Sequence, residues 1–93
     1  MSEGEKYHYI PGQLFNVTLS DSTEAVFTDQ YGISGYCTGF HTSGADGTMT
    51  VVGADAASDT VTLYVLKGTY YPYGVRYFKS TGTAPTITVA AVR

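Results

Sequence analysis

The chain has 93 residues, a formal net charge of −3 and one cysteine, Cys37. This length suits a single domain, and a lone cysteine excludes an intrachain disulfide. The first residues have neither the basic nor the apolar region of a signal peptide, and no apolar run approaches the ~20 residues of a membrane helix. Because a domain of this size buries only about 60–65% of its unfolded surface, we expect association with further copies to supplement its stability.

Residues 1–12 differ from the rest of the chain because they lack alternation of apolar and polar residues. They contain Tyr7, Tyr9 and a Pro-Gly pair, and we interpret them as an extended N-terminal arm that precedes a domain over residues 13–93. Two interpretations of the arm remain open. It docks on a neighbouring subunit through its tyrosines, or it is a disordered terminus.

The remainder is rich in threonine, contains 11 glycines and nine tyrosines, and has almost no helix signal. Period-two alternation predicts short strands in the following ranges: 13–19, 24–28, 33–41, 47–52, 60–66, 75–79 and 86–92. The sequence SGADG (43–47) predicts a hairpin turn, and Gly82 suits a turn with positive φ. Six to eight strands with regular turns indicate an all-β chain, namely a single compact antiparallel β-sandwich, jelly-roll-like in form, or a small barrel.

The charged residues are unevenly distributed along the chain. All eight acidic residues lie within 1–59 and four of the five basic residues lie within 60–93, so the two parts carry −7 and +4. No basic cluster is dense enough to follow phosphates, which argues against nucleic-acid binding. Opposed charges either form a head-to-tail contact between subunits or pair within one domain, and the sequence leaves both possibilities open.

No group of residues has the arrangement of a catalytic site. His41, Ser43 and Asp46 are close in sequence, but around a tight turn their side chains would splay outward. Cys37 has the character of a small buried hydrophobic residue, and the two histidines lack the company of further metal ligands. We therefore expect no enzyme activity, no cofactor and no metal site.

The segment KGTYYPYGVRYFKSTGT (67–83) holds the densest group of tyrosines, interspersed with two cations: Tyr70, Tyr71, Tyr73, Arg76, Tyr77 and Lys79. Tyrosine offers a large apolar face and a polar tip, and it is enriched in interface hot spots. It also stacks on sugar rings, and in a chain without tryptophan it must supply part of the core. Alternation places bulky side chains on both faces of this segment. This arrangement favours a subunit interface over a purely structural role.

Short motifs in 59–92 resemble small proteins of tailed bacteriophages and phage-like gene transfer agents. The matching positions are 59–62, Gly68-Thr69, Pro72, Val75-Arg76, 81–83 and 87–91, and similar motifs occur upstream in LSDST (19–23), GISGYCTGF (32–40) and GADGTMTV (44–51). The resemblance covers roughly residues 17–92. The chain departs from the pattern in its arm and in having tyrosines where aliphatic residues are expected.

The resemblance implies a virion structural protein, either the base of a head spike or fibre or a capsid decoration protein. Such a protein would be assembled in the host cytoplasm as a pentamer or trimer and bound to other virion proteins, without nucleic acid or membrane as partners. The resemblance gives three sets of residues their roles. The subunit or partner contacts are Tyr70, Tyr71, Tyr73 and Arg76, joined by Tyr7 and Tyr9 of the arm; the loop-shaping residues are Gly68, Pro72 and Gly82; the core residues are Val61, Leu63, Val65, Val75, Ile87 and Val89. The alternative is a β-sandwich module that binds carbohydrate or a host surface.

Overall fold

The computed structural model describes residues 13–29, 31–55 and 59–93, so the expected N-terminal arm lies outside the described residues. In this part of the chain every regular element is a β-strand and every pairing is antiparallel. The strands are β1 (Leu14–Val17), β2 (Val26–Thr28), β3 (Ser34–Tyr36), β4 (Gly39–Ser43), β5 (Gly47–Gly53), β6 (Thr60–Val65), β7 (Thr69–Tyr71), β8 (Val75–Phe78) and β9 (Thr88–Val92). The described residues form nine strands instead of six to eight, partly because the range 33–41 divides into β3 and β4 at Cys37 and Thr38.

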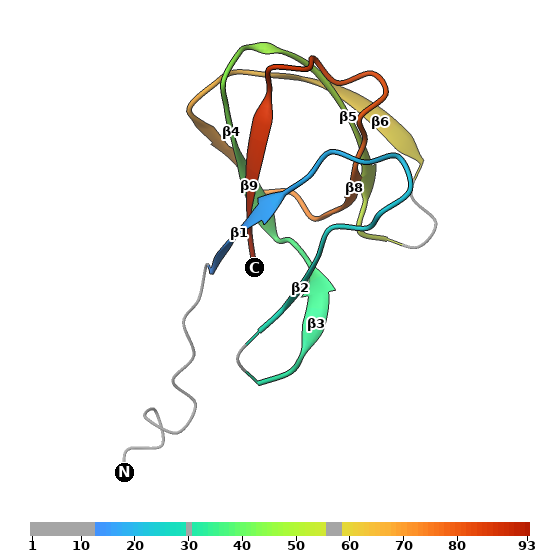
Figure 1. The fold of residues 1–93 in the computed structure, drawn as a ribbon, viewed down its shortest axis with the longest axis vertical. Helices are drawn as coiled ribbons and strands as arrows, with labels where there is room; N and C mark the ends of the chain where they lie inside the picture. Colours follow the sequence, from blue (N-terminus) through green and yellow to red (C-terminus); the bar gives the residue numbers. More distant parts are fainter. Residues whose placement is uncertain (1–12, 30, 56–58) are drawn as a thin grey trace.

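Seven strands form the two layers of a sandwich (Figure 1). The four-stranded sheet has the order β1-β9-β4-β7, and the three-stranded sheet has the order β6-β5-β8. The chain passes repeatedly from one sheet to the other, which is the winding of a jelly roll. Strands β2 and β3 form a separate hairpin that projects from the body. The expected all-β, jelly-roll-like sandwich is confirmed.

The core lies between the two sheets. Phe40 of the four-stranded sheet meets Phe78 of the three-stranded sheet edge to face, with ring centroids 5.1 Å apart. Both rings are almost completely buried, and they are surrounded by Cys37, Met49, Val51, Val65, Val75, Ile87, Val89 and Ala91. Such burial of apolar area supplies most of the folding free energy of a small domain.

Four of the six residues expected in the core are buried in it, namely Val65, Val75, Ile87 and Val89. Leu63 is half-buried and packs against the core. The assignment of Val61 was wrong, because its side chain is 46% exposed. Val61 has the inward parity of its strand, but it lies at the rim of a hollow that the facing chain does not fill.

The Asp-Gly segment 43–47 does not close a hairpin, so this prediction was also wrong. It carries the chain from β4 in one sheet to β5 in the other. Strand β4 is already paired on both sides, with β7 and β9, and β5 lies between β6 and β8. Gly44 turns the chain between the layers with a φ of 92°, a conformation that favours glycine.

Strand β8 departs from the strict alternation that its sequence predicts. Phe78 pairs with Val51 and Val75 pairs with Gly53. Residues 75–78 of β8 therefore lie opposite only residues 51–53 of β5, which is one residue fewer. This is a β-bulge, and Arg76 lies within it. As a result Val75 and Phe78, which alternation places on opposite faces, are both buried.

Asp21 joins the loop after β1 to the loop between β8 and β9. Its carboxylate accepts hydrogen bonds from the backbone N–H groups of Ser80 and Thr81, both at 3.0 Å, and from the Thr81 hydroxyl. The Lys79 ammonium donates to the Asp21 carbonyl at 3.4 Å. The Thr81 hydroxyl, together with these backbone donors, holds the pKa of Asp21 below its usual value.

This geometry predicts a specific acid dependence of stability. Because the folded-state pKa is lowered, the carboxylate stabilises the fold above its unfolded pKa of about 3.9. The contribution disappears as the pH falls through the lower folded-state pKa. We expect Asp21→Asn to lower Tm at pH 6, with the difference from the wild type shrinking as the pH falls below about 4. Asp59→Asn, which changes an exposed carboxylate before β6, is the control, and a constant Tm difference for Asp21→Asn across this range would contradict the prediction.

Candidate interaction surface

The tyrosine segment does not form one platform, because its side chains lie in different parts of the fold. Tyr71 points toward the core, where its ring stacks on Phe40 with centroids 5.5 Å apart. Its hydroxyl accepts a hydrogen bond from the Leu66 N–H at 2.9 Å, which ties the turn after β6 to β7. Tyr71 therefore supports the sandwich itself, and only part of its surface is available to another subunit.

Tyr70 lies on the opposite, outer face of the four-stranded sheet. Its ring covers Gly39, where a Cβ atom would overlap the phenol, and it lies 4.9 Å from the His41 ring on the neighbouring strand. The side chain is 44% exposed. Tyr70 thus presents a fixed aromatic surface that a subunit or another partner can contact.

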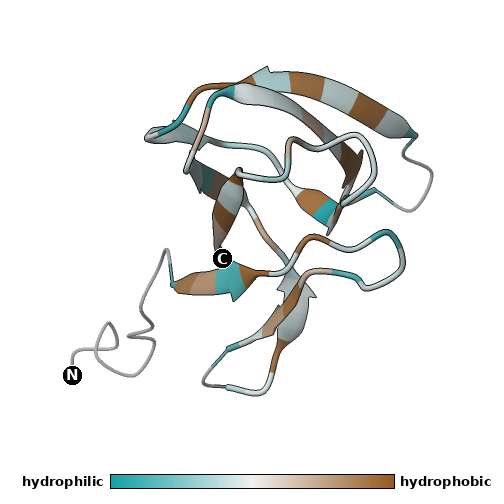
Figure 2. Ribbon diagram, turned by 45° about the horizontal axis from the view of Figure 1, so that its top comes forward, coloured by the Kyte–Doolittle hydropathy of each residue, from teal (hydrophilic) through white to brown (hydrophobic). Residues whose placement is uncertain are grey.

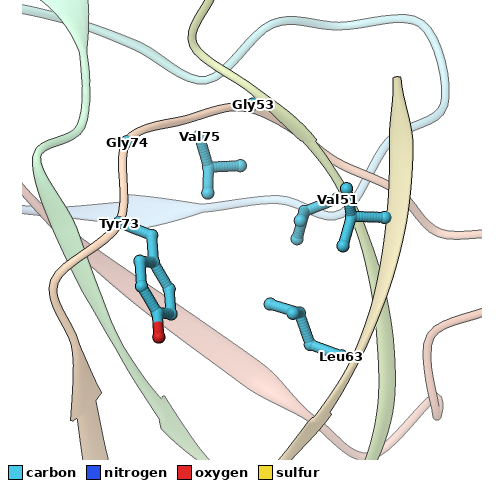
Figure 3. A pocket seen from close by; sticks show the side chains of 7 residues that line it. Val51, Gly53, Leu63, Tyr73, Gly74 and Val75 are labelled. Atoms are coloured by element: carbon cyan, nitrogen blue, oxygen red, sulfur yellow. The ribbon is translucent and has the colours of Figure 1, made fainter. Parts of the chain in front are cut away.

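Tyr73 lies beside an apolar hollow (Figure 3). The hollow has a volume of about 240 Å³ and lies between the start of β6, the end of β5 and the connection from β7 to β8. Figure 3 shows the side chains of Tyr73, Val75, Val51 and Leu63 around the open space. The sequence analysis did not predict this hollow. Its one indication in the sequence was the alternation of β6, which directs the apolar side chains of Val61 and Leu63 toward the inner face.

Arg76 is engaged within its own chain. Its Nε lies 3.8 Å from a carboxylate oxygen of Glu24, and the same carboxylate accepts a hydrogen bond from the Tyr36 hydroxyl at 3.0 Å. This hydrogen bond raises the pKa of Tyr36. Arg76 and Lys79 both lie over the ring of Tyr77, at 5.2 and 5.6 Å from its centroid. In this region, an acidic residue from the first part of the chain therefore pairs with a basic residue from the second part within one domain.

The three expected loop-shaping residues lie in turns. Gly68 and Gly82 have φ values of 75° and 86°, which suits glycine best. Pro72 directly follows β7, where it cannot donate a hydrogen bond to extend the ladder. Tyr7 and Tyr9, which were expected to contact a partner, lie outside the described residues.

The three side chains considered for catalysis each contact a different residue outside the group. His41 stacks on Tyr70, the Ser43 hydroxyl bonds that of Thr88 at 2.6 Å, and Asp46 accepts the Lys67 N–H at 2.8 Å. Within residues 13–29, 31–55 and 59–93 there is no cluster of three or more His, Cys, Asp or Glu side chains suited to a metal ion. The same residues contain no helix long and apolar enough to cross a membrane.

Cys37 has the buried position that its sequence context suggested, with 2% of its surface exposed. Its thiol lies near the carbonyl oxygens of Tyr73 and Val75, at 3.7 and 3.6 Å. Burial raises the pKa of this thiol, which keeps it protonated at neutral pH. Its environment is that of a core residue and not of a nucleophile.

Two further apolar surfaces are exposed. Tyr64 of β6 and Leu66, which directly follows the strand, are 67% and 51% exposed. On the projecting hairpin, Val26, Tyr31 and Ile33 are 45%, 55% and 58% exposed. These exposed apolar side chains are candidate contacts for another molecule.

Comparison with known proteins adds one finding to this geometry. No protein-family model matches the chain, and no curated protein matches it significantly. Among solved structures it is similar to a chain from the capsid of a native gene transfer agent (GTA) particle computed with C5 symmetry. The two chains are 23% identical, the match covers 100% of each, and the TM-score is 0.69. At this identity the likeness establishes a shared fold over the whole domain.

Proposed function

We propose that this protein is a structural component of a phage-like virion, attached to the head as a spike or fibre base or as a decoration protein. The observation that carries the proposal is the fold similarity to a GTA capsid chain over the full length of both chains. The resemblance of the sequence motifs to small phage proteins supports the same class independently.

The surface of the domain supports a role in assembly. Aromatic and aliphatic side chains are exposed on several sides of the described residues, including Tyr64, Tyr70 and Tyr73, whereas the side chains considered for catalysis are dispersed. We propose that the protein acts as a homo-oligomer, a pentamer or a trimer. The C5 symmetry with which the comparison particle was computed supports the pentamer.

The test is binding to heads that lack this protein, combined with the solution mass from light scattering. We expect the purified protein to bind such heads saturably, at a fixed number of copies, as a preformed oligomer or as a subunit that multimerises on the head. Tyr70→Ala removes an exposed ring and should weaken head binding or oligomerisation by about tenfold or more, the size of a hot-spot effect. Tyr71→Ala is unsuited to this purpose, because Tyr71 packs on the core.

The matched control is Tyr31→Ala, which removes a comparably exposed ring from the projecting hairpin. Equal losses for the two variants would indicate that tyrosine content, and not the Tyr70 surface, determines binding. Failure of the wild-type protein to bind heads at any concentration would contradict the proposed function. Specific glycan binding that Tyr70→Ala abolishes at unchanged mass would favour the carbohydrate-binding module instead.

A further inference from the structure

Strand β6 forms an unprotected edge of the three-stranded sheet. It has six residues, Thr60–Val65, with neither a charge nor a proline, and the structure gives it one ladder partner, β5. Figure 2 shows β6 at the top of the molecule as alternating apolar and near-neutral residues. A long edge of this composition exposes unpaired backbone groups that can accept an additional strand.

The other edges are shorter or already covered. The free side of β8 receives hydrogen bonds from the backbone N–H groups of Ser20 and Ala25, at 2.9 and 2.8 Å, to its carbonyl oxygens. Strand β7 has three residues and is followed by Pro72, and β1 has four. Because proteins usually protect their edge strands, the unprotected one is the edge where a partner is expected.

The apolar hollow lies directly beside this edge. Val61 and Leu63 of β6 both line it, and Figure 3 shows Tyr73 across the open space from Leu63. Its volume of about 240 Å³ is below the ~300–1,000 Å³ of typical small-molecule sites. A cavity of ~150 Å³ holds one benzene ring, so this hollow suits a single aromatic side chain. A strand added to β6 would direct every second side chain toward it.

The chain itself contains a segment with these properties. Residues 1–12 precede Gln13, whose backbone pairs with Arg93 beside β1. A fully extended chain of this length would span up to ~40 Å. Tyr7 and Tyr9 are two positions apart, so on a strand they would share one face. Glu3, Glu5 and Lys6 precede them.

Charged residues lie at both ends of β6. Asp59 precedes the strand, and Lys67 follows it, where the Asp46 carboxylate accepts the Lys67 N–H at 2.8 Å. Because an acidic residue lies at each end, the charges do not select a direction for an added strand.

We propose that the N-terminal segment of a neighbouring copy adds to β6 as a further strand and inserts Tyr7 or Tyr9 into the hollow. The start of β1 and strand β6 lie on opposite sides of the molecule in both Figure 1 and Figure 2. To reach the hollow of its own chain the segment would have to cross the body of the domain, whereas the segment of a neighbouring copy would not. This inference rests on the homo-oligomer of the proposed function and names the contact that builds it.

Cross-linking of full-length variants tests the contact. Tyr7→Cys and Val61→Cys proteins, each with Cys37→Ala, are mixed at micromolar concentration and treated with a short bismaleimide. A parallel set retains the buried Cys37 in case Cys37→Ala impairs folding. The docked segment holds the two thiols at a millimolar effective concentration, so we expect at least about tenfold more heterodimer than for Tyr7→Cys with Thr88→Cys. Thr88 is exposed on the four-stranded sheet and serves as the control.

Equal cross-linking to both positions would overturn the proposal. So would a protein carrying both Tyr7→Cys and Val61→Cys that forms only an intramolecular link at every concentration, because the segment would then occupy its own hollow. Heterodimers specific to Val61→Cys support docking on a neighbour.

A charge in the hollow gives a second measurement. Val61→Asp should weaken the oligomer by about tenfold or more, because docking would bury an unpaired carboxylate. Val26→Asp is the matched control, since Val26 is 45% exposed and Val61 is 46% exposed. If Val61→Asp oligomerises and binds heads like the wild type, the docking inference fails while the proposed function stands. If the wild type neither oligomerises nor binds heads, both fail.

Discussion

Phe40→Ala is expected to lower the free energy of unfolding by about 3–5 kcal/mol, the usual cost of truncating a buried phenylalanine. Phe40 is 0% exposed and contacts aromatic rings on two sides, Tyr71 within its own sheet and Phe78 across the sandwich. Its removal leaves a cavity where the two sheets meet. A domain of this size has a total stability of about 5–14 kcal/mol, so the variant should approach the threshold of unfolding.

Urea unfolding followed by circular dichroism measures this loss. Phe40→Leu is the control, because it retains most of the apolar volume and should cost less than about 2 kcal/mol. A loss below about 1 kcal/mol for Phe40→Ala would show that the contact between the sheets is less important than the packing indicates.

Gly44→Ala should be strongly destabilising, whereas Gly68→Ala should be mild. Both glycines have positive φ, at 92° and 75°, and an alanine pays about 1–2 kcal/mol in that region. At Gly68 the added Cβ meets nothing within 4 Å, so we expect no further cost. At Gly44 it would overlap the backbone carbonyl oxygen of Thr86, and backbone cannot move aside as a side chain can. We expect a loss of about 3 kcal/mol or more.

The difference between the two glycine variants isolates the steric term, because the conformational cost is common to both. Thermal unfolding of the two proteins at one pH measures it. Similar Tm values would mean that the chain near Thr86 shifts easily and that the passage between the sheets is less constrained than its geometry suggests.

The candidate site could be predicted only in part. The aromatic segment of residues 67–83 was visible in the sequence, and Tyr70 and Tyr73 are both exposed. The structure separates them, because Tyr70 faces outward from the four-stranded sheet while Tyr73 borders the hollow. Tyr71, between them, contributes to the core. Alternation predicts that neighbouring side chains point to opposite faces, but it contains no information on what covers each face.

The sequence by itself determined the fold class. Period-two alternation, frequent turns and the lack of helix signals are local properties, and they predict short antiparallel strands and the buried positions of Val65, Ile87 and Val89. Only the tertiary structure decided which strands pair. Strand β4 pairs with β7 and β9 and not with β5, although the Asp-Gly segment between β4 and β5 is a strong local signal for a hairpin. The bulge at Arg76 and the hollow beside β6 likewise arise from contacts between distant segments. The physical reason is that strand pairing is chosen by the burial of apolar surface between whole sheets, and no short window of sequence contains that surface.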